Sequence, residues 1–283
     1  MTIEITQEFL EGRPLSYSSL KQFRKSPKHY IQYLTKPFAP SAEMMLGTLV
    51  HTLTLEPEEF EKRYMLYVKP TGTGSVAAKN NLIDIANQAK RILITQEEVD
   101  TAKIIHQALM DHEQSRILIE NRRKVEINLR WRHKETNLPL TGKIDFESRA
   151  WDTDFILDLK TSRDSDPDEF LKQAVKLDYH MQVGSYSDGY PRKFFKFPNF
   201  MFIVVETVEP YNVSVMFCDN KYVEQAKDEF YGTLLAFRRC MDKGLFNQGY
   251  EFRLMETRDY FSMRLPGWYR PKFQTVTEEE MNQ

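Results

Sequence analysis

Residues 140–161, LTGKIDFESRAWDTDFILDLKT, limit the possible folds of this chain more than any other stretch. They contain two apolar runs of strand length separated by a short polar turn, which predicts two strands. Each run carries a carboxylate among large apolar neighbours, Asp145 in the first and Asp158 in the second. Because a buried, ionised carboxylate loses its hydration, each one needs partners that compensate its charge.

The rest of the chain alternates between helical and strand-like patterns. Apolar residues two apart, or in short continuous runs, predict strands at 124–132, 138–148, 154–161, 200–208 and 212–218. Helices are expected at 14–34 (two, divided at Pro27), 41–55 with a continuation after Pro57, 77–121 (two, with a break near 94–95), 166–177, 179–190 and 221–244. Residues 1–14 are expected to form a loose lead-in. This order predicts an α/β fold with a mixed central sheet, preceded by a helical region.

Composition excludes some classes of protein. With 283 residues and 41% hydrophobic content the chain can bury a sizeable core, but no apolar run approaches the ~18 residues that span a bilayer. The acidic N-terminus, MTIEITQEFLEGRP, lacks a signal-peptide core, so a cytoplasmic protein is expected. Cys218 and Cys240 lie far apart and have no metal-binding spacing, which indicates reduced thiols. The net charge of −2 does not exclude a nucleic-acid partner, because the distribution of charge matters more than its sum.

Basic residues gather in three stretches that are candidates for DNA contact. Residues 13–42 contain six Lys or Arg and no acid, and YPRKFFKFPNF at 190–200 interleaves cations with aromatic residues, which suits stacking on a single strand or a wedge at a duplex end. The third stretch is NRRKVEINLRWRHK at 121–134. An ordinary solvated charged face is the alternative for each, and it is the stronger one for the second and third. The candidate residues are Arg24, Lys25, Lys28, Arg192 and Lys193.

The carboxylates and one lysine indicate a particular chemistry. Asp158 and Lys160 are two apart and therefore face the same side of a strand, and Asp145 lies beside them if the two strands pair. Two neighbouring carboxylates repel each other unless a cation joins them, and oxygen ligands suit Mg²⁺ or Mn²⁺. A nearby lysine can orient or help deprotonate a metal-bound water and offset charge on a pentavalent phosphate. This set is what metal-assisted phosphodiester hydrolysis needs. The alternative is two carboxylates flanking a turn and a solvated lysine.

Two further pairs share a helical face, because their members are four residues apart. Gly47 allows another element to approach closely, and the imidazole of His51 can ligate a metal. Gln182 and Tyr186 form the second pair. Taken alone, each pair is equally typical of an ordinary helix.

Taken together, these pairs make the chain resemble nucleases of the PD-(D/E)xK superfamily, in its RecB-like branch. That branch shows, in order, a Gly-x-x-x-His helix, a Gly-x-x-Asp strand, an (Asp/Glu)-x-Lys strand and a Gln-x-x-x-Tyr helix. The matching pairs here are Gly47/His51, Gly142/Asp145, Asp158/Lys160 and Gln182/Tyr186. The segments YHMQVGSYSDGY, MLGTLVHTLTLEPEEF and SYSSLKQFRKSPKHY resemble the RecE type, exodeoxyribonuclease VIII of bacteria and prophages, over roughly residues 15 to 240.

The resemblance implies a restriction-endonuclease-like core and gives its residues roles. His51, Asp145, Asp158 and the backbone carbonyl of Leu159 would bind Mg²⁺, for which Mn²⁺ can substitute. Lys160 would activate the water, while Gln182 and Tyr186 would hold the site and the DNA backbone near it. Glu126 is either an outer carboxylate of the site or solvated strand surface. Relatives with an iron–sulfur cluster use four cysteines, so two distant cysteines predict no cluster.

The resemblance also implies a function and an organisation. The chain would be a Mg²⁺-dependent exonuclease that degrades the 5′ strand of double-stranded DNA from its ends and leaves a 3′ single strand for recombination. A RecT-type annealing partner and a ring-shaped homo-oligomer would be expected. The alternatives are a restriction-like endonuclease of the same fold and a non-catalytic DNA-binding protein, the latter disfavoured by four intact motif positions. We expect a helical region at 1–120, a nuclease core at 121–265 and a flexible tail at 266–283, acting as one domain.

Overall fold

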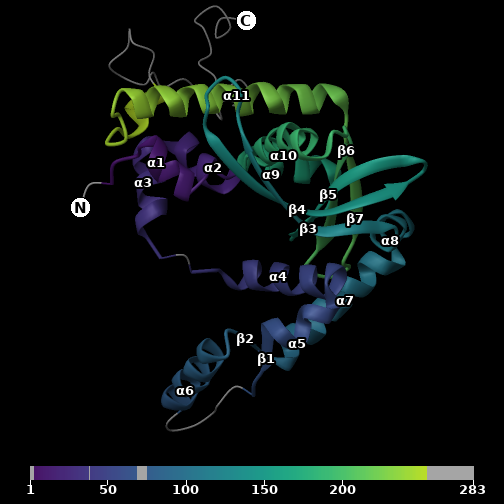
Figure 1. Cartoon of the computed structure of the whole chain (residues 1–283). Helices are drawn as coiled ribbons and strands as arrows, with labels where there is room; N and C mark the ends of the chain where they lie inside the picture. The colour runs from purple at the N-terminus through teal and green to yellow at the C-terminus, as the bar shows by residue number, and fades with distance from the viewer. Residues whose placement is uncertain (1–2, 38, 69–74, 254–283) are drawn as a thin grey trace, which may run out of the picture.

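The computed structural model describes residues 3–37, 39–68 and 75–253 (Figure 1). Within these residues, five strands form one mixed sheet in the order β3-β4-β5-β6-β7. Neighbouring strands are antiparallel except for β5 and β6, which are parallel. The strands are β3 (Arg122–Arg132), β4 (Pro139–Ala150), β5 (Thr153–Ser162), β6 (Asn199–Glu206) and β7 (Val213–Cys218). Each strand lies where the apolar pattern predicts it, and the α/β fold with a mixed sheet is confirmed.

Helices cover both faces of the sheet, so the molecule has three layers (Figure 1). One face packs against α1 (Gln7–Gly12), α2 (Tyr17–Lys25), α3 (Pro27–Thr35), α9 (Pro167–Lys176), α10 (Tyr179–Phe194) and α11 (Asn220–Asp242). The other face packs against α4 (Ala42–Leu55), α7 (Gln96–Asp111) and α8 (Glu113–Glu120). The region before residue 121 supplies apolar side chains to both hydrophobic clusters, so it shares its core with the strands. Among the described helices, none is long and apolar enough to cross a membrane.

Several short elements differ from the sequence prediction. The expected lead-in contains α1, whose first turn is capped by the Thr6 side chain. The continuation after Pro57 is a 3₁₀ turn, η1 (Pro57–Glu59), followed by α5 (Phe60–Arg63). The region predicted as two helices contains α6 (Ser75–Gln88), β2 (Ile92–Ile94), α7 and α8, and β2 pairs in parallel with β1 (Tyr64–Leu66). Strands of three residues are too short to show a period, so the apolar pattern could not separate them from helix.

Other boundaries follow from local chemistry that the sequence already shows. Asp166 caps α9 by accepting hydrogen bonds from the backbone N–H groups of Asp168 and Glu169, and Pro167 is the first helical residue. The long helix α11 ends just before Gly244, whose φ of +64° lies in the left-handed region that glycine adopts without strain. The last element is η2 (Tyr250–Arg253). The predicted tail at 266–283 lies outside the described residues.

One feature of the sheet positions the two aspartates of the candidate site. β4 and β5 pair from the hairpin at residues 150–153 up to Phe146 and Leu157, and within the described residues the pairing stops there. Beyond this point β4 continues alongside β3, and β5 continues alongside β6. We call this separation of β4 from β5 the sheet fork. The next residue on each strand is an aspartate, Asp145 on β4 and Asp158 on β5.

Candidate active site

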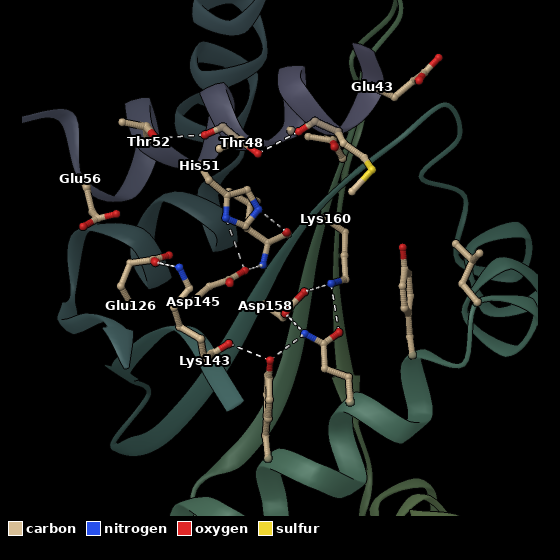
Figure 2. A pocket seen from close by; sticks show the side chains of 18 of the residues that line it. Glu43, Thr48, His51, Thr52, Glu56, Glu126, Lys143, Asp145, Asp158 and Lys160 are labelled. Atoms are coloured by element: carbon tan, nitrogen blue, oxygen red, sulfur yellow. Dashed lines mark hydrogen bonds and ion pairs between the residues drawn. The ribbon is translucent and has the colours of Figure 1, made fainter. Parts of the chain in front are cut away.

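The sheet fork leaves backbone groups of Leu159 without a strand partner, and side chains bind them instead. The N–H of Leu159 donates to Asp145 Oδ2 over 2.8 Å. Its carbonyl oxygen lies 2.6 Å from Nε2 of His51, on α4. Because a carbonyl only accepts, Nε2 carries the proton in this contact. His51 Nδ1 in turn lies 3.6 Å from Asp145 Oδ2, so an imidazole, a carboxylate and a carbonyl meet at one point (Figure 2).

A second group forms on the other side of β5, where the residues face α10. Lys160 Nζ forms an ion pair with Asp158 Oδ2 and donates to Gln182 Oε1 over 3.1 Å. The amide nitrogen of Gln182 donates to the other oxygen of Asp158, which closes a ring of three side chains. Asp158 is only 2% exposed. The ammonium of Lys160 also lies 4.6 Å from the ring centre of Tyr179, at the start of α10.

Tyr186 connects the second group to β4. Its hydroxyl donates to the carbonyl of Lys143 over 2.7 Å and lies 3.5 Å from the amide nitrogen of Gln182. The ring occupies the space over Gly142, where an added Cβ would come within 2.7 Å of a ring carbon. The glycine of the Gly-x-x-Asp motif is therefore needed to let this tyrosine reach the strand.

Gly47 has the corresponding role on α4. A Cβ at this position would lie 2.9 Å from the hydroxyl of Thr161 on β5. The absence of a side chain lets α4 approach the strand closely enough for His51, one turn later, to reach Leu159. Gly47 and Gly142 thus each allow a neighbouring element to approach closely. His51 and Tyr186 are the side chains that make polar contacts across these close approaches.

Next to the site, the alternation of side chains between the two faces of the sheet is interrupted on both β3 and β4. Residues two apart on a strand normally share a face. Ile144 nevertheless packs in the cluster under α10 and Phe146 in the cluster under α4. On β3, Ile127 and Val125 divide between the two clusters in the same way, and Glu126 between them has a left-handed φ of 52°. This switch turns Asp145 away from α10 and towards His51.

The two groups border one open cleft of about 650 Å³. Its outer wall carries further charge, of which the sequence pointed to Glu126 but not to Glu56, Arg63 or Lys143. Arg63 donates to both carboxylate oxygens of Glu56, over 2.7 and 2.9 Å. Lys143 forms an ion pair with Glu126 (Figure 2). Glu126 therefore lines the cleft and holds a lysine, which places it in the outer part of the site. Lys143 stands two residues before Asp145, inside the strand motif.

The electrostatics of the two groups differ. Burial and the negative charge of Asp158 raise the pKa of Asp145 to about 6. For Lys160, burial acts to lower the pKa, but the charge of Asp158 outweighs it and the pKa is raised. Lys160 is therefore protonated at neutral pH. In this state it can donate hydrogen bonds and offset negative charge, but it cannot accept a proton.

The donors at the sheet fork suit a divalent cation. His51, Asp145 and the Leu159 carbonyl supply one nitrogen and two kinds of oxygen ligand, a set that Mg²⁺ and Mn²⁺ accept. Within the described part of the chain, no three His, Cys, Asp or Glu side chains come close enough to surround one ion. The reason is that the carboxylate of Asp158 is turned to Lys160 and Gln182. Its buried Oδ2 contacts the ammonium but accepts no hydrogen bond of good geometry in the described structure, so it keeps acceptor capacity.

The first basic stretch lies on α2 and α3, beside α10. Within it, Arg24 is occupied by the protein itself: its guanidinium contacts Asp178 at 3.2 Å and Glu229 at 3.0 Å. Lys25 and Lys28 are exposed. Lys21, which the sequence analysis did not single out, lies 5.9 Å from the ring centre of Tyr179, the same ring that Lys160 contacts. Its position in the stretch without acidic residues, one turn before Arg24, could have identified Lys21 from the sequence.

The second basic stretch lies at the end of α10. Arg192 pairs with Asp188 at 2.8 Å, and Lys193 donates to the backbone carbonyl of Asn128 over 2.6 Å. Both cations are thus held against the protein, whereas the side chain of Lys196 is 53% exposed. Of the five candidate DNA contacts, Lys25 and Lys28 are the ones whose ammonium groups face solvent without an ion pair among the described residues.

The comparisons with known proteins agree with this geometry. The family model described as "PDDEXK-like domain of unknown function (DUF3799)" matches residues 16–248. The curated proteins contain no match. The fold is similar to the crystal structure of a candidate exonuclease from Eubacterium rectale, with 13% identity and a TM-score of 0.56 over 86% of this chain and 88% of that chain. A second solved structure, SSO0001, matches with 11% identity and a TM-score of 0.28 over 71% of this chain and 95% of that chain, too weakly to support an argument.

Because the family model covers most of its length, the chain belongs to this family of PDDEXK-like domains. The predicted PD-(D/E)xK resemblance is confirmed, as is the predicted fold. The narrower resemblance to the RecE type stays a prediction.

Proposed function

We propose that this chain is a metal-dependent exodeoxyribonuclease that digests double-stranded DNA from its ends in the 5′-to-3′ direction. The observation that carries the proposal is the arrangement at the sheet fork. A protonated, buried lysine lies on one side of β5, and a set of metal-ligating groups lies on the other, both bordering one open cleft. This is the combination that phosphodiester hydrolysis requires.

The residues divide the chemistry between them. His51, Asp145 and the Leu159 carbonyl would hold Mg²⁺, or Mn²⁺ in its place, and the ion would supply Lewis-acid activation of water and of the phosphate. Lys160 would orient the attacking water and stabilise charge that develops on the phosphate, which is the role its raised pKa allows. Gln182 fixes the ammonium by accepting one of its hydrogen bonds, and Asp158 fixes it by charge.

DNA would enter along the side of the cleft that Tyr179 of α10 lines, where Lys21 of α2 lies 5.9 Å from the ring centre of Tyr179. Lys21, Lys25 and Lys28 would neutralise phosphates there, which requires no net positive charge on the whole protein. Arg24 would instead hold α2 against α10 and α11 through Asp178 and Glu229. The acidic partners explain why one cation of this stretch serves the fold while its neighbours face solvent.

The wider assignment rests on the RecE-type resemblance. It proposes that a 3′ single strand remains, that a RecT-type annealing protein receives it, and that several copies form a ring around the DNA. A ring keeps an enzyme linked to its product and so supports processive digestion. A sedimentation mass equal to one chain, at micromolar protein and with DNA present, would count against the ring but not against the nuclease.

One assay tests the central proposal. A linear duplex labelled separately at each 5′ and 3′ end is incubated with the protein and Mg²⁺, and in parallel with a chelator. We expect Mg²⁺-dependent loss of the 5′ label first. Early loss of the 3′ label would contradict the polarity, and no digestion under either condition would contradict the nuclease.

A matched substrate distinguishes the proposed exonuclease from a restriction-like endonuclease of the same fold. Closed circular duplex of the same sequence offers no end, so an exonuclease leaves it intact, whereas a restriction-like endonuclease nicks it. Linearising that circle at one site should restore digestion. Nicking of the closed circle at a rate similar to digestion of the linear form would replace the exonuclease proposal with the endonuclease alternative.

A further inference from the structure

The end of the sheet at the β4–β5 hairpin carries exposed aromatic side chains. Trp151, in the β4–β5 hairpin, is 52% exposed, and Phe195 and Phe197, in the connection from α10 to β6, are 87% and 85% exposed. β5 and β6 pair at Phe155 and Asn199, which brings this connection next to the hairpin. This end of the sheet lies beside the end of α8, where Arg149 N bonds Asn121 O (Figure 1). We call Trp151, Phe195, Lys196 and Phe197 the aromatic tip.

Three cationic side chains lie close to the β4–β5 hairpin. Asp154, next to the hairpin, is approached by Arg123 at 3.3 Å, by Arg149 at 3.6 Å and by Lys196 at 4.0 Å. Asp152, which is exposed in the hairpin beside Trp151, is a second carboxylate, so three cations face two acids and positive charge is in excess by one. Their side chains are 45%, 45% and 53% exposed, so they can also reach a ligand in solvent.

The backbone supplies an independent observation. Trp151 has a φ of 49° and Phe195 a φ of 55°, both in the left-handed region that bulky L-residues disfavour. Asn or Gly would fit either position without strain. Phe195 is 87% exposed and gains little from burial, whereas Trp151 makes one edge-to-face contact with Phe155, with ring centres 6.0 Å apart, and leaves half of its surface in solvent. Two exposed aromatic residues in strained backbone, at one end of one sheet, therefore point to a use for their rings.

We propose that the aromatic tip binds single-stranded nucleic acid, with bases stacked on Phe195, Phe197 and Trp151 and phosphates paired with Lys196, Arg123 and Arg149. Exposed rings interleaved with cations are the features by which proteins bind single strands without sequence preference. A duplex is the weaker fit, because its bases already stack on one another. Thr153 and Asp158 are five residue steps apart on β5, a distance of about 17 Å along the strand, so the tip is a second site on the same sheet.

In the nuclease the strand bound here would be the one left undigested, and this clause alone rests on the proposed function. Binding itself is measured without cleavage. Labelled oligothymidine is titrated with the intact chain in chelator, and a duplex of equal length is titrated in parallel. If binding is found and the digestion assay fails, the tip stands and the nuclease proposal falls.

The test variant is the double substitution Phe195→Asn and Phe197→Ser. Asn suits the left-handed backbone and both positions are exposed, so the fold should persist, as a thermal unfolding curve will check. We expect single-strand affinity to fall by about tenfold for each ring lost, and duplex affinity to change less than about twofold. Leu235→Ala, which removes an exposed apolar side chain from α11, is the matched control and should change neither.

Two further readouts are specific to stacking and to charge. Base stacking on Trp151 should quench its fluorescence, so oligothymidine should quench the parent protein, and Trp151→Phe should lose most of that quenching while it keeps affinity within about threefold. Lys196→Ala should lower the salt dependence of single-strand binding by about one counterion.

Three outcomes would overturn the proposal. Unchanged single-strand affinity in the double variant would do so. Equal losses on single strand and duplex would assign the surface to duplex backbone instead. A double variant that sediments at a lower mass than the parent, with single-strand affinity intact, would make the aromatic tip an interface between copies of this chain.

Discussion

Asp145 and Asp158 stand at the same level of the sheet on neighbouring strands, but the protein surrounds them differently. Asp145 faces a histidine and the backbone N–H of Leu159, and its pKa is raised to about 6 by burial and by the second carboxylate. Asp158 is paired with the buried ammonium of Lys160 and accepts from Gln182. The surroundings of Asp145 disfavour its ionised form. The ionised form of Asp158, in contrast, is needed to balance the buried ammonium of Lys160.

The difference indicates that the two residues have different primary roles. A carboxylate whose ionised form is disfavoured is relieved by a cation, which suits a metal ligand. A carboxylate that neutralises a lysine positions that lysine. The sequence pattern predicts both as metal ligands. In the structure Asp145 contacts His51, and Asp158 contacts Lys160.

The largest effect is expected for Lys160→Met. It removes the ammonium that acts on phosphate and leaves Asp158 buried without a cation. Cleavage should fall by a factor of about 10² to 10³. The free energy of unfolding should fall by about 3–5 kcal/mol, the cost of breaking a buried ion pair. Linear-duplex digestion and urea unfolding measure the two effects.

Lys172→Met is the matched control, because Lys172 also pairs with a carboxylate, Glu169, but on the exposed surface of α9. It should leave both digestion and stability unchanged. Parent-like cleavage by Lys160→Met would mean that the second group is structural only.

The next effect is a difference of sign between Asp145→Asn and Asp158→Asn. Without metal at pH 7.5, Asp145→Asn should raise the free energy of unfolding by on the order of 2 kcal/mol, because folding disfavours the ionised carboxylate. Asp158→Asn should lower it, because Lys160 loses its counter-charge. Calorimetric Mg²⁺ titration should show the larger loss of affinity for Asp145→Asn. Destabilisation by both substitutions would remove the distinction between the two carboxylates.

The third prediction concerns pH. The folded-state pKa of Asp145, about 6, is above its unfolded value of about 3.9, so its contribution to stability is fully present below pH 4 and is lost as pH rises through 6. The metal-free parent should therefore lose stability between pH 4 and 7 relative to Asp145→Asn. Over pH 5 to 7, Mg²⁺ affinity should rise by about tenfold as the carboxylate ionises. A pH-independent Mg²⁺ affinity would contradict the raised pKa.

The smallest effect is expected for Tyr186→Phe, which keeps the ring over Gly142 and removes the hydroxyl that bonds Lys143 O. The loss of one hydrogen bond should cost about 1 kcal/mol of stability. Cleavage should fall by less than about tenfold, because Lys160 and Asp158 stay in place. Gly142→Ala is the contrasting variant: it should displace the whole ring and reduce digestion further than Tyr186→Phe does.

The sequence was sufficient for the parts of this site that depend on local spacing. Period-two and period-3.6 patterns placed the strands and most helices, and pairs two or four apart correctly predicted which side chains share a face. β4 pairs with β5, as the hypothesis required, but the pairing ends at Phe146 and Leu157, one residue before the two aspartates. Three-residue strands such as β1 and β2 could not be predicted, since they bury too little to show a pattern.

The sequence was insufficient wherever a partner lies far along the chain. Arg24 looked available for DNA, but its carboxylate partners are Asp178 and Glu229, 154 and 205 residues away. The hydrogen bond that Asp158 accepts from Gln182 likewise depends on how α10 packs against the sheet. The change of facing at Glu126 and the end of pairing at Phe146 are properties of two strands together, which no single stretch encodes.

The sheet fork has a further consequence for hydrogen exchange. In an unbroken sheet the amide proton of Leu159 would be protected by a neighbouring strand and would report only on unfolding. Here it is held by the carboxylate of Asp145. Its exchange with deuterium therefore depends on whether that carboxylate is protonated, ionised or engaged by a cation, while the amides of Phe155 and Leu157, on the same side of the strand, stay protected by β4. One backbone amide thus records the state of the site without any added probe.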